Sequence, residues 1–248
     1  RRHMGQHITV LGGPKAPPVV SLDAHVSTNP LYGGCRRIVP LDMKRGMLAT
    51  ASGDYTVKVW KSDQTNSLSE HTLSYTNRHP WCMIVLPDGE SLVTGASDGM
   101  IDIWDWEKGA HKRQCSGHTA CVTALAVSTH AEKFFSAADD GAVKVWANVG
   151  LCLLTFQGHT SRLTTLTWLQ ASGLLVSGSR DTTLRVWDPE RERELDTLTG
   201  HTSSVFCAAA VPSTGDLVSG SDDGTLRLWS IRSGRCKTVF TGHKRCVW

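Results

Sequence analysis

Apolar and polar residues alternate in short runs along most of this chain. Before each of five tryptophans, the first and third preceding residues are apolar and a charged residue stands between them; the triplets are VKV before Trp60, IDI before Trp104, VKV before Trp146, LRV before Trp187 and LRL before Trp229. A period of two is typical of a β-strand. A second apolar run precedes each of these strands and ends in a small polar turn such as SGSRD, which predicts a hairpin.

Two more apolar runs complete each unit. One follows a histidine, as in VTALAV and LTTLTW, and a shorter one precedes the next histidine, as in CLLTF and ELDTL. Four consecutive strands joined by turns predict a four-stranded antiparallel sheet for each unit.

The units recur with a nearly constant period, because the five tryptophans are 41 to 44 residues apart. In three copies a histidine, a serine and an aspartate keep fixed distances from the tryptophan: His118, Ser136, Asp140 and Trp146; His159, Ser177, Asp181 and Trp187; His201, Ser219, Asp223 and Trp229. Two earlier copies keep Thr50, Asp54 and Trp60, and Thr94, Asp98 and Trp104, while His25 and His79 stand at other spacings. Such a period marks an array of small units that bury their apolar faces against one another.

The Gly-His pairs and the Trp-Asp pairs Trp104-Asp105 and Trp187-Asp188 resemble the WD-repeat family of β-propellers. Lys61, Ala147 and Ser230 stand where the other copies would have the aspartate. The resemblance implies an all-β fold of four-stranded antiparallel blades arranged in a ring, with loops on two opposite faces that serve as a platform for proteins.

The expected organisation is a single propeller segment over residues 1–248 with five full blades and partial blades at both ends. We assign 1–35 to the last strands of a partial blade and an inserted loop around Pro30 and Tyr32; the full blades to 36–78, 79–117, 118–158, 159–200 and 201–242; and 243–248 to the start of a further blade. We expect a complete ring of seven blades, with six as the alternative. The missing strands would come from residues beyond 248 or from another chain.

The repeated His, Ser and Asp residues are also the residue types of a hydrolase triad. A triad needs one activated nucleophile with its base and oxyanion hole, whereas here the same set recurs together with a tryptophan. The family resemblance implies a buried hydrogen-bonded chain from Trp through Ser or Thr and His to Asp. We therefore expect these quartets to stabilise the fold and expect no catalytic residues.

Composition narrows the function further. The chain has 26 Lys and Arg against 23 Asp and Glu, for a net charge of +3, which is too weak a bias to favour nucleic acid. Its eight cysteines form no CxxC pair, so they are expected to be mostly buried, reduced thiols. No motif for a metal, nucleotide or other cofactor is present, and no apolar run is long enough for a membrane span. A cytoplasmic location is expected, with nuclear or cytoskeletal alternatives.

Binding residues are expected on the narrower face, which in this family is formed by the turn before the tryptophan strand and the loop after the histidine. The candidates are Trp81, Arg162, Arg180, Lys244 and Arg245. The basic residues predict acidic or phosphorylated peptides as ligands, unless Asp139 and Asp222 neutralise them internally. Trp81 is either an aromatic anchor for a partner or is packed over a blade edge, and Trp106 is a weaker candidate on the opposite face.

The predicted function is a non-catalytic scaffold or adaptor that binds proteins or peptides within a multi-protein complex. The alternative is a substrate-recognition propeller of a ubiquitin ligase that reads acidic or phosphorylated peptides. This alternative rests on the arginine before a turn aspartate, Arg180, which resembles repeats of F-box propellers, although Phe206 stands where a second arginine would be expected.

Overall fold

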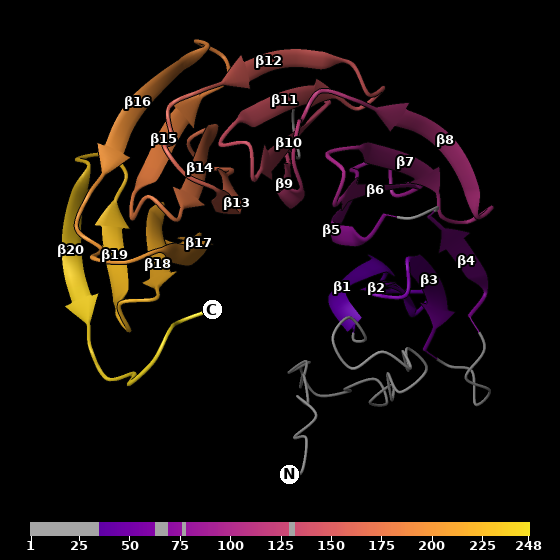
Figure 1. Ribbon diagram of the computed structural model, residues 1–248, viewed down its shortest axis with the longest axis horizontal. Helices are drawn as coiled ribbons and strands as arrows, with labels where there is room; N and C mark the ends of the chain where they lie inside the picture. The colour runs from indigo at the N-terminus through magenta and orange to yellow at the C-terminus, as the bar shows by residue number, and fades with distance from the viewer. Residues whose placement is uncertain (1–34, 63–68, 76–77, 129–131) are drawn as a thin grey trace.

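The protein is all-β in the computed structural model, which describes residues 35–62, 69–75, 78–128 and 132–248. These residues form five sheets of four strands and contain no helix (Figure 1). The first sheet comprises β1 (Cys35–Asp42), β2 (Met47–Ser52), β3 (Thr56–Lys61) and β4 (His71–Ser74), and the second β5 (Pro80–Val85), β6 (Ser91–Ala96), β7 (Ile101–Asp105) and β8 (Ala110–Cys115). The third comprises β9 (Val122–Val127), β10 (Lys133–Ala138), β11 (Val143–Ala147) and β12 (Cys152–Phe156). The fourth comprises β13 (Leu163–Leu169), β14 (Leu174–Ser179), β15 (Leu184–Asp188) and β16 (Arg193–Leu198), and the fifth β17 (Val205–Val211), β18 (Asp216–Ser221), β19 (Leu226–Ser230) and β20 (Arg235–Phe240).

Each sheet is an antiparallel meander in which every strand pairs with the next one in sequence. The turn between the second and third strands has a residue with positive φ directly after its aspartate. Glycine takes this position in three sheets, whereas Tyr55 and Thr182 adopt φ of 67° and 74° in the first and fourth. Glycine is favoured there because a Cβ makes the left-handed region costly.

Figure 1 shows the five sheets following one another around an open arc, with β1, β5, β9, β13 and β17 on the inside and β4, β8, β12, β16 and β20 on the outside. The inner strands of consecutive sheets contact each other. The predicted architecture of four-stranded antiparallel propeller blades is therefore confirmed. The expected strands within residues 1–34 lie outside the described residues, and the ring of seven blades stays a prediction.

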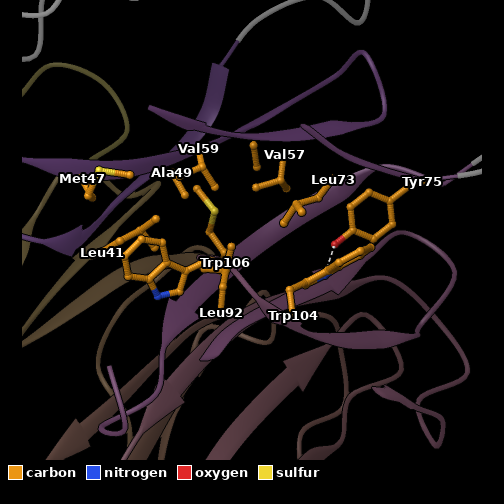
Figure 2. Packing of buried hydrophobic residues seen from close by; sticks show 12 residues of the cluster. Leu41, Met47, Ala49, Val57, Val59, Leu73, Tyr75, Leu92, Trp104 and Trp106 are labelled. Atoms are coloured by element: carbon orange, nitrogen blue, oxygen red, sulfur yellow. Dashed lines mark hydrogen bonds between the residues drawn. The ribbon is translucent and has the colours of Figure 1, made fainter. Parts of the chain in front are cut away.

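The hydrophobic core lies between consecutive sheets. Figure 2 shows the first of these interfaces, where Met47 and Val59 of the first sheet face Leu92 and Trp106 of the second. At a later interface Phe156 of the third sheet stacks on Trp187 of the fourth, with ring centroids 5.0 Å apart. Each sheet thus buries its apolar residues against its neighbours, as expected for a repeat array.

The innermost strands share a β-bulge near their first residue. In the third and fourth sheets the bulged residues are Thr123 and Thr164. Their hydroxyls donate hydrogen bonds to the carbonyl oxygens of Leu163 and Val205, the first residues of the next innermost strands. The bulges therefore connect neighbouring sheets around the inside of the arc.

Seven cysteines lie in the described part with placed side chains, and all are free thiols. Only Cys82 and Cys115 are buried, so the expectation of mostly buried thiols is wrong for this part of the chain. Burial raises the pKa of Cys82 to about 12. Within the described residues, no helix has the length and apolar character that crossing a bilayer requires.

Candidate functional site

The structure brings together the repeated polar residues of the third, fourth and fifth sheets. In the third sheet the Trp146 indole donates to Ser136 Oγ over 2.8 Å, and Ser136 Oγ lies 2.7 Å from His118 Nε2. The opposite ring nitrogen, His118 Nδ1, lies 2.9 Å from Asp140 Oδ2. The corresponding distances are 2.8, 2.9 and 2.7 Å for Trp187, Ser177, His159 and Asp181, and 2.8 Å throughout for Trp229, Ser219, His201 and Asp223.

The aspartate of each quartet joins a loop to a turn. Asp140 Oδ2 also accepts the backbone amide of Thr119, in the loop before β9, and Oδ1 accepts the amide of Ala142, in the turn before β11. Burial raises the pKa of Asp140, but the hydrogen bonds from His118 and these amides outweigh burial and hold it at about 2. The carboxylate is therefore charged at neutral pH and holds the loop and the turn in one arrangement.

Burial favours the neutral form of two quartet histidines. Burial lowers the pKa of His159 and His201, although the hydrogen bonds to Asp181 and Asp223 act in the opposite direction. A neutral imidazole can accept the serine proton at Nε2 and donate its Nδ1 proton to the carboxylate. The hydrogen-bond chain is then complete from indole to aspartate.

These quartets lack the access that catalysis requires. Ser136, Ser177 and Ser219 are all 0% exposed, and each hydroxyl oxygen already accepts an indole proton. A nucleophile has to reach a substrate carbonyl beside an oxyanion hole. The arrangement suits a buried structural network, in which every member has a partner.

The second sheet has a tyrosine in place of the histidine in its network. Trp104 Nε1 donates to Tyr75 Oη at 2.9 Å (Figure 2). The Tyr75 hydroxyl also contacts the Thr94 hydroxyl, and Trp104 Nε1 lies 3.0 Å from Thr94 Oγ1. His79 instead stacks on Tyr55, with centroids 4.2 Å apart. The irregular spacing of His79 signalled the departure, but nothing in the spacing pointed to Tyr75.

In the first sheet, Trp60 Nε1 donates to Thr50 Oγ1 over 2.8 Å, so this part of the network is present. Asp54 accepts hydrogen bonds from the backbone amide and the hydroxyl of Thr56. The expected histidine, His25, lies outside the described residues.

The second sheet also differs in the contact between the residue before the histidine and the charged residue of the third strand. In the fourth and fifth sheets the glycine before the histidine lies against an arginine, and a Cβ at Gly158 would stand 2.6 Å from Arg185 Nη1. In the second sheet Arg78 occupies the glycine position and Asp102 occupies the basic position. Arg78 Nη2 lies 3.2 Å from Asp102 Oδ2. A basic side chain therefore lies at this contact in the second sheet too, but the residue before the histidine supplies it and not the third strand.

Asp102 is fully buried and has further partners. His111 Nε2 lies 2.9 Å and Gln114 Nε2 3.2 Å from its Oδ1, while Arg78 also lies over the Tyr75 ring at 5.2 Å. A buried carboxylate is stable only when it is paired and hydrogen-bonded, and this cluster provides both. The alternating sequence pattern placed Asp102 on a strand, but it gave no sign that its side chain is buried.

The four basic residues predicted to bind a partner lie on turns and loops at one end of the sheets. Arg180, in a turn, donates its backbone amide to the carbonyl of Arg162, in a loop. In the same way the loop of Lys244 and Arg245 adjoins the turn of the fifth sheet, where a Cβ at Gly224 would lie 3.5 Å from the Arg245 carbonyl. Turns and loops therefore alternate along this narrow face.

Internal pairing accounts for part of the charge on this face. Arg162 Nη1 lies 3.4 Å from Asp139 Oδ2, with the arginine side chain 60% exposed. Asp222 contacts Ser203 Oγ and Cys246 Sγ. Among the described residues, Arg180, Lys244 and Arg245 form no ion pair. All three are exposed, so these basic side chains are accessible to a partner.

The two tryptophan candidates differ in location. Trp81 was predicted in a loop, but it is the bulged second residue of β5 and is 40% exposed. Phe206 holds the same position in β17 and stacks on Trp248, with centroids 4.4 Å apart. Trp106 is only 2% exposed and donates to the carbonyl of Gly89 over 2.9 Å, so it is a core residue and its prediction as a binding residue is wrong.

The chain matches the WD domain, G-beta repeat family over residues 63–105, 109–147, 150–188 and 192–230, together more than half of its length. Each matched repeat ends with the third strand of one sheet and begins at or before the outer strand of the preceding sheet, so sequence repeats and structural sheets are offset by one strand.

Similar proteins carry the same repeats. The chain is 32% identical to periodic tryptophan protein 2 of Arabidopsis thaliana over 132 residues, which is 52% of this chain and 15% of that protein. It is 32% identical to transducin-like enhancer protein 2 of Mus musculus over 150 residues, 58% of this chain and 19% of that protein, and to nuclear distribution protein nudF of Aspergillus flavus over 111 residues, 43% and 24%. The matches thus span less than a quarter of each relative.

Among solved structures, "Structure of U3-55K" superposes with a TM-score of 0.73 at 24% identity, covering 84% of this chain and 64% of that one. At this identity the likeness concerns the fold. The family match, the repeated quartets and the consecutive four-stranded sheets agree, and the chain belongs to the WD-repeat family.

Proposed function

We propose that this protein is a non-catalytic scaffold or adaptor that binds partner proteins or peptides through its narrow face. WD-repeat proteins generally act as platforms for protein interaction, and the matched relatives belong to this class. The observation that carries the proposal is that Arg180, Lys244 and Arg245 are exposed, form no ion pair within the described residues, and lie on turns and loops at the same end of the sheets. Repeated sheets give these residues a rigid support, which limits the entropy lost when a partner binds.

The chemistry of these residues favours acidic or phosphorylated peptides. Arginine binds carboxylate and phosphate oxygens through two parallel hydrogen bonds, and lysine adds a point charge. Fields from charges within about 10 Å add at moderate salt. Trp81 would supply an aromatic contact from the inner strand of the second sheet. Arg162, which is paired with Asp139, would contribute after exchanging that partner for the ligand.

A second candidate function is substrate recognition for a ubiquitin ligase. Its support is Arg180, which directly precedes the turn aspartate Asp181 and is exposed. The ligand chemistry would be the same, so the two candidates differ in the other proteins of the complex. Location in the cytoplasm or nucleus stays a prediction for both.

The test is binding of defined peptides to a charge-reversed protein. Arg180→Glu/Arg245→Glu should lose affinity for acidic and phosphorylated peptides at least about tenfold, and the loss should shrink as salt is added. The matched control is Arg193→Glu/Arg235→Glu, which reverses two exposed arginines at equivalent positions of the outer strands β16 and β20. Arg227 is unsuitable as a control, because its Nε is buried and its side chain packs on Gly200.

Peptide affinity is measured by fluorescence anisotropy at the same ionic strength for both double variants. Equal affinities would exclude the narrow face as the binding site. The inserted segment around Pro30 and Tyr32, which lies outside the described residues, would be tested next.

A further inference from the structure

The outer strand of the third sheet, β12, presents apolar side chains to solvent. Val149 is 64% exposed, Leu151 62% and Leu153 47%, all within the turn before β12 or on the strand itself. Single exposed apolar residues are common on protein surfaces, but three at alternating positions form a local patch. None of these residues belongs to the narrow face or to a quartet.

The patch lacks the charges that protect the neighbouring outer strands. From Val145 to Ser161 the sequence contains no Lys, Arg, Asp or Glu, whereas β8, β16 and β20 each carry at least two such residues. Outer strands pair on one side only, so an uncharged outer strand is open to pairing with another chain.

The outer strands β8, β12, β16 and β20 each contain a β-bulge, and the residue at the bulge distinguishes β12 from β8 and β20. The bulged residue is Lys112 in β8 and Lys237 in β20, and these lysines donate to Ser91 and Asp216 at the start of the second strand of their own sheets. In β12 the same position is Leu153, which has no such polar contact and remains exposed. The fold therefore tolerates lysine here, and the leucine is not required for folding.

The charges beside the patch indicate which partner would fit. Arg113 of β8 packs its stem against Gly150, since a Cβ at this glycine would lie 2.8 Å from Arg113 Cδ, and it forms no ion pair among the described residues. On the other side of the turn, the backbone carbonyl of the exposed Glu132 accepts the amide of Asn148. A partner carboxylate would thus be attracted to the Arg113 side of the patch and repelled from the Glu132 side.

We propose that β12 and its preceding turn, residues 149–156, dock an extended segment of another protein that has apolar side chains at alternating positions and an acidic residue at the end beside Arg113. Strand addition would give main-chain hydrogen bonds along the open edge, while Val149, Leu151 and Leu153 bury the partner's apolar side chains. The bulge at Leu153 bends the edge and limits the paired length to a short segment.

The experiment selects from a displayed library of random linear peptides on the wild-type protein, with counter-selection on Leu151→Lys/Leu153→Lys. We expect enriched peptides with alternating apolar residues and an Asp or Glu toward one end. Their synthetic forms should bind the double variant at least about tenfold more weakly. Leu195→Lys is the matched control, because Leu195 is the bulged residue of β16, is 41% exposed and should not change binding.

Arg113→Glu tests the charge preference by reversing it. This variant should bind the selected peptide more tightly when the acidic residue of the peptide is replaced by lysine than when it is kept. Thermal unfolding of each variant checks that the fold is retained. The proposal is overturned if no peptide is enriched, if the enriched peptides lack the alternating pattern, or if Leu195→Lys weakens binding as much as the double variant. It is also overturned if sedimentation shows self-association that Leu151→Lys/Leu153→Lys abolishes, because the occupant would then be a second copy of this chain.

Discussion

At the scale of single residues, the Ser177 hydroxyl shows how tightly the quartets are constrained. It accepts the Trp187 indole proton, lies 2.9 Å from His159 Nε2 and is fully buried. If one member is removed, the remaining polar groups lose their partners without gaining water. The cost is therefore set by burial more than by the strength of any one hydrogen bond.

Asp181→Ala should lower the free energy of unfolding by about 1 to 3 kcal/mol, because it leaves His159 Nδ1 and the Thr160 amide without their acceptor. The measurement is equilibrium denaturation in urea. Asp98→Ala is the matched control: Asp98 occupies the same turn position, but within the described part of the chain its only partners are the Met100 amide and, through a 3.6 Å ion pair, Arg78. This substitution should cost roughly 1 kcal/mol or less. Equal losses for the two variants would show that the turn, not the quartet, carries the stability.

Stability should also fall in two stages as the pH is lowered. The pKa values of His159 and His201 are below that of a free histidine, so the unfolded chain binds protons first and stability declines below about pH 6.5. The pKa of Asp140 is about 2 in the folded state, so its contribution is complete above the unfolded value near 4 and is lost as the pH falls toward 2. Urea titrations at a series of pH values would reveal both stages, and a flat profile between pH 7 and 5 would contradict the first.

Much of this residue-level picture could be predicted from sequence where the spacing is regular. The three sets with a constant spacing indicated which side chains would meet, because a fixed offset in a repeat gives a fixed place in the sheet. Tyr75 could not be predicted, since it comes from a different position in the loop and replaces an imidazole with a phenol. The burial of Trp106 was missed because a tryptophan after a strand is equally compatible with a surface turn.

At the scale of the element, the second sheet keeps a basic side chain at the contact between its third strand and the residue before the histidine, but the basic residue has changed position. The third sheet places Gly117 beside Lys144, whereas the second places Arg78 beside Asp102. In both arrangements a long basic side chain lies at the tryptophan strand. The strand itself supplies it in the third sheet, and the segment before the first strand supplies it in the second. A strand pattern specifies which residues share a face, but it does not specify which neighbouring loop supplies the counter-charge.

This exchange predicts a coupled pair of substitutions. Arg78→Gly should cost about 3 kcal/mol or more, because it leaves the buried Asp102 without its cation. Arg78→Gly/Asp102→Lys recreates the glycine and lysine of the third sheet and should be less unstable than the sum of the two single variants by about 1 to 3 kcal/mol. Urea denaturation of all four proteins completes the cycle. Additive losses would show that Arg78 and Asp102 act independently.

At the scale of the whole molecule, the position of a sheet along the arc determines how much of its apolar surface is buried by neighbouring sheets. Leu184 and Val186 of the fourth sheet are 0% and 2% exposed, since sheets pack on both of its faces. Leu226 and Leu228 hold the same positions in the fifth sheet but are only partly buried, and Phe240 is 48% exposed. The repeat pattern makes these sheets equivalent in sequence, and only the three-dimensional arrangement distinguishes them.

Because each unit of a repeat array is stabilised by its own fold and by its neighbours, a sheet that is less buried by its neighbours should have a lower local stability. In a protein that consists of residues 1–248, we expect the amides of β19 to exchange hydrogen through openings of lower free energy than those of β15, although both are third strands with the same hydrogen-bond pattern. Hydrogen exchange followed by mass spectrometry on peptides covering the two strands measures the difference. Asp181→Ala should accelerate exchange in β15 and also in β19, since the fifth sheet rests on the fourth, whereas Asp223→Ala should affect β19 far more than β15. Equal protection of the two strands in the unsubstituted protein would mean that the outward face of the fifth sheet is covered in solution.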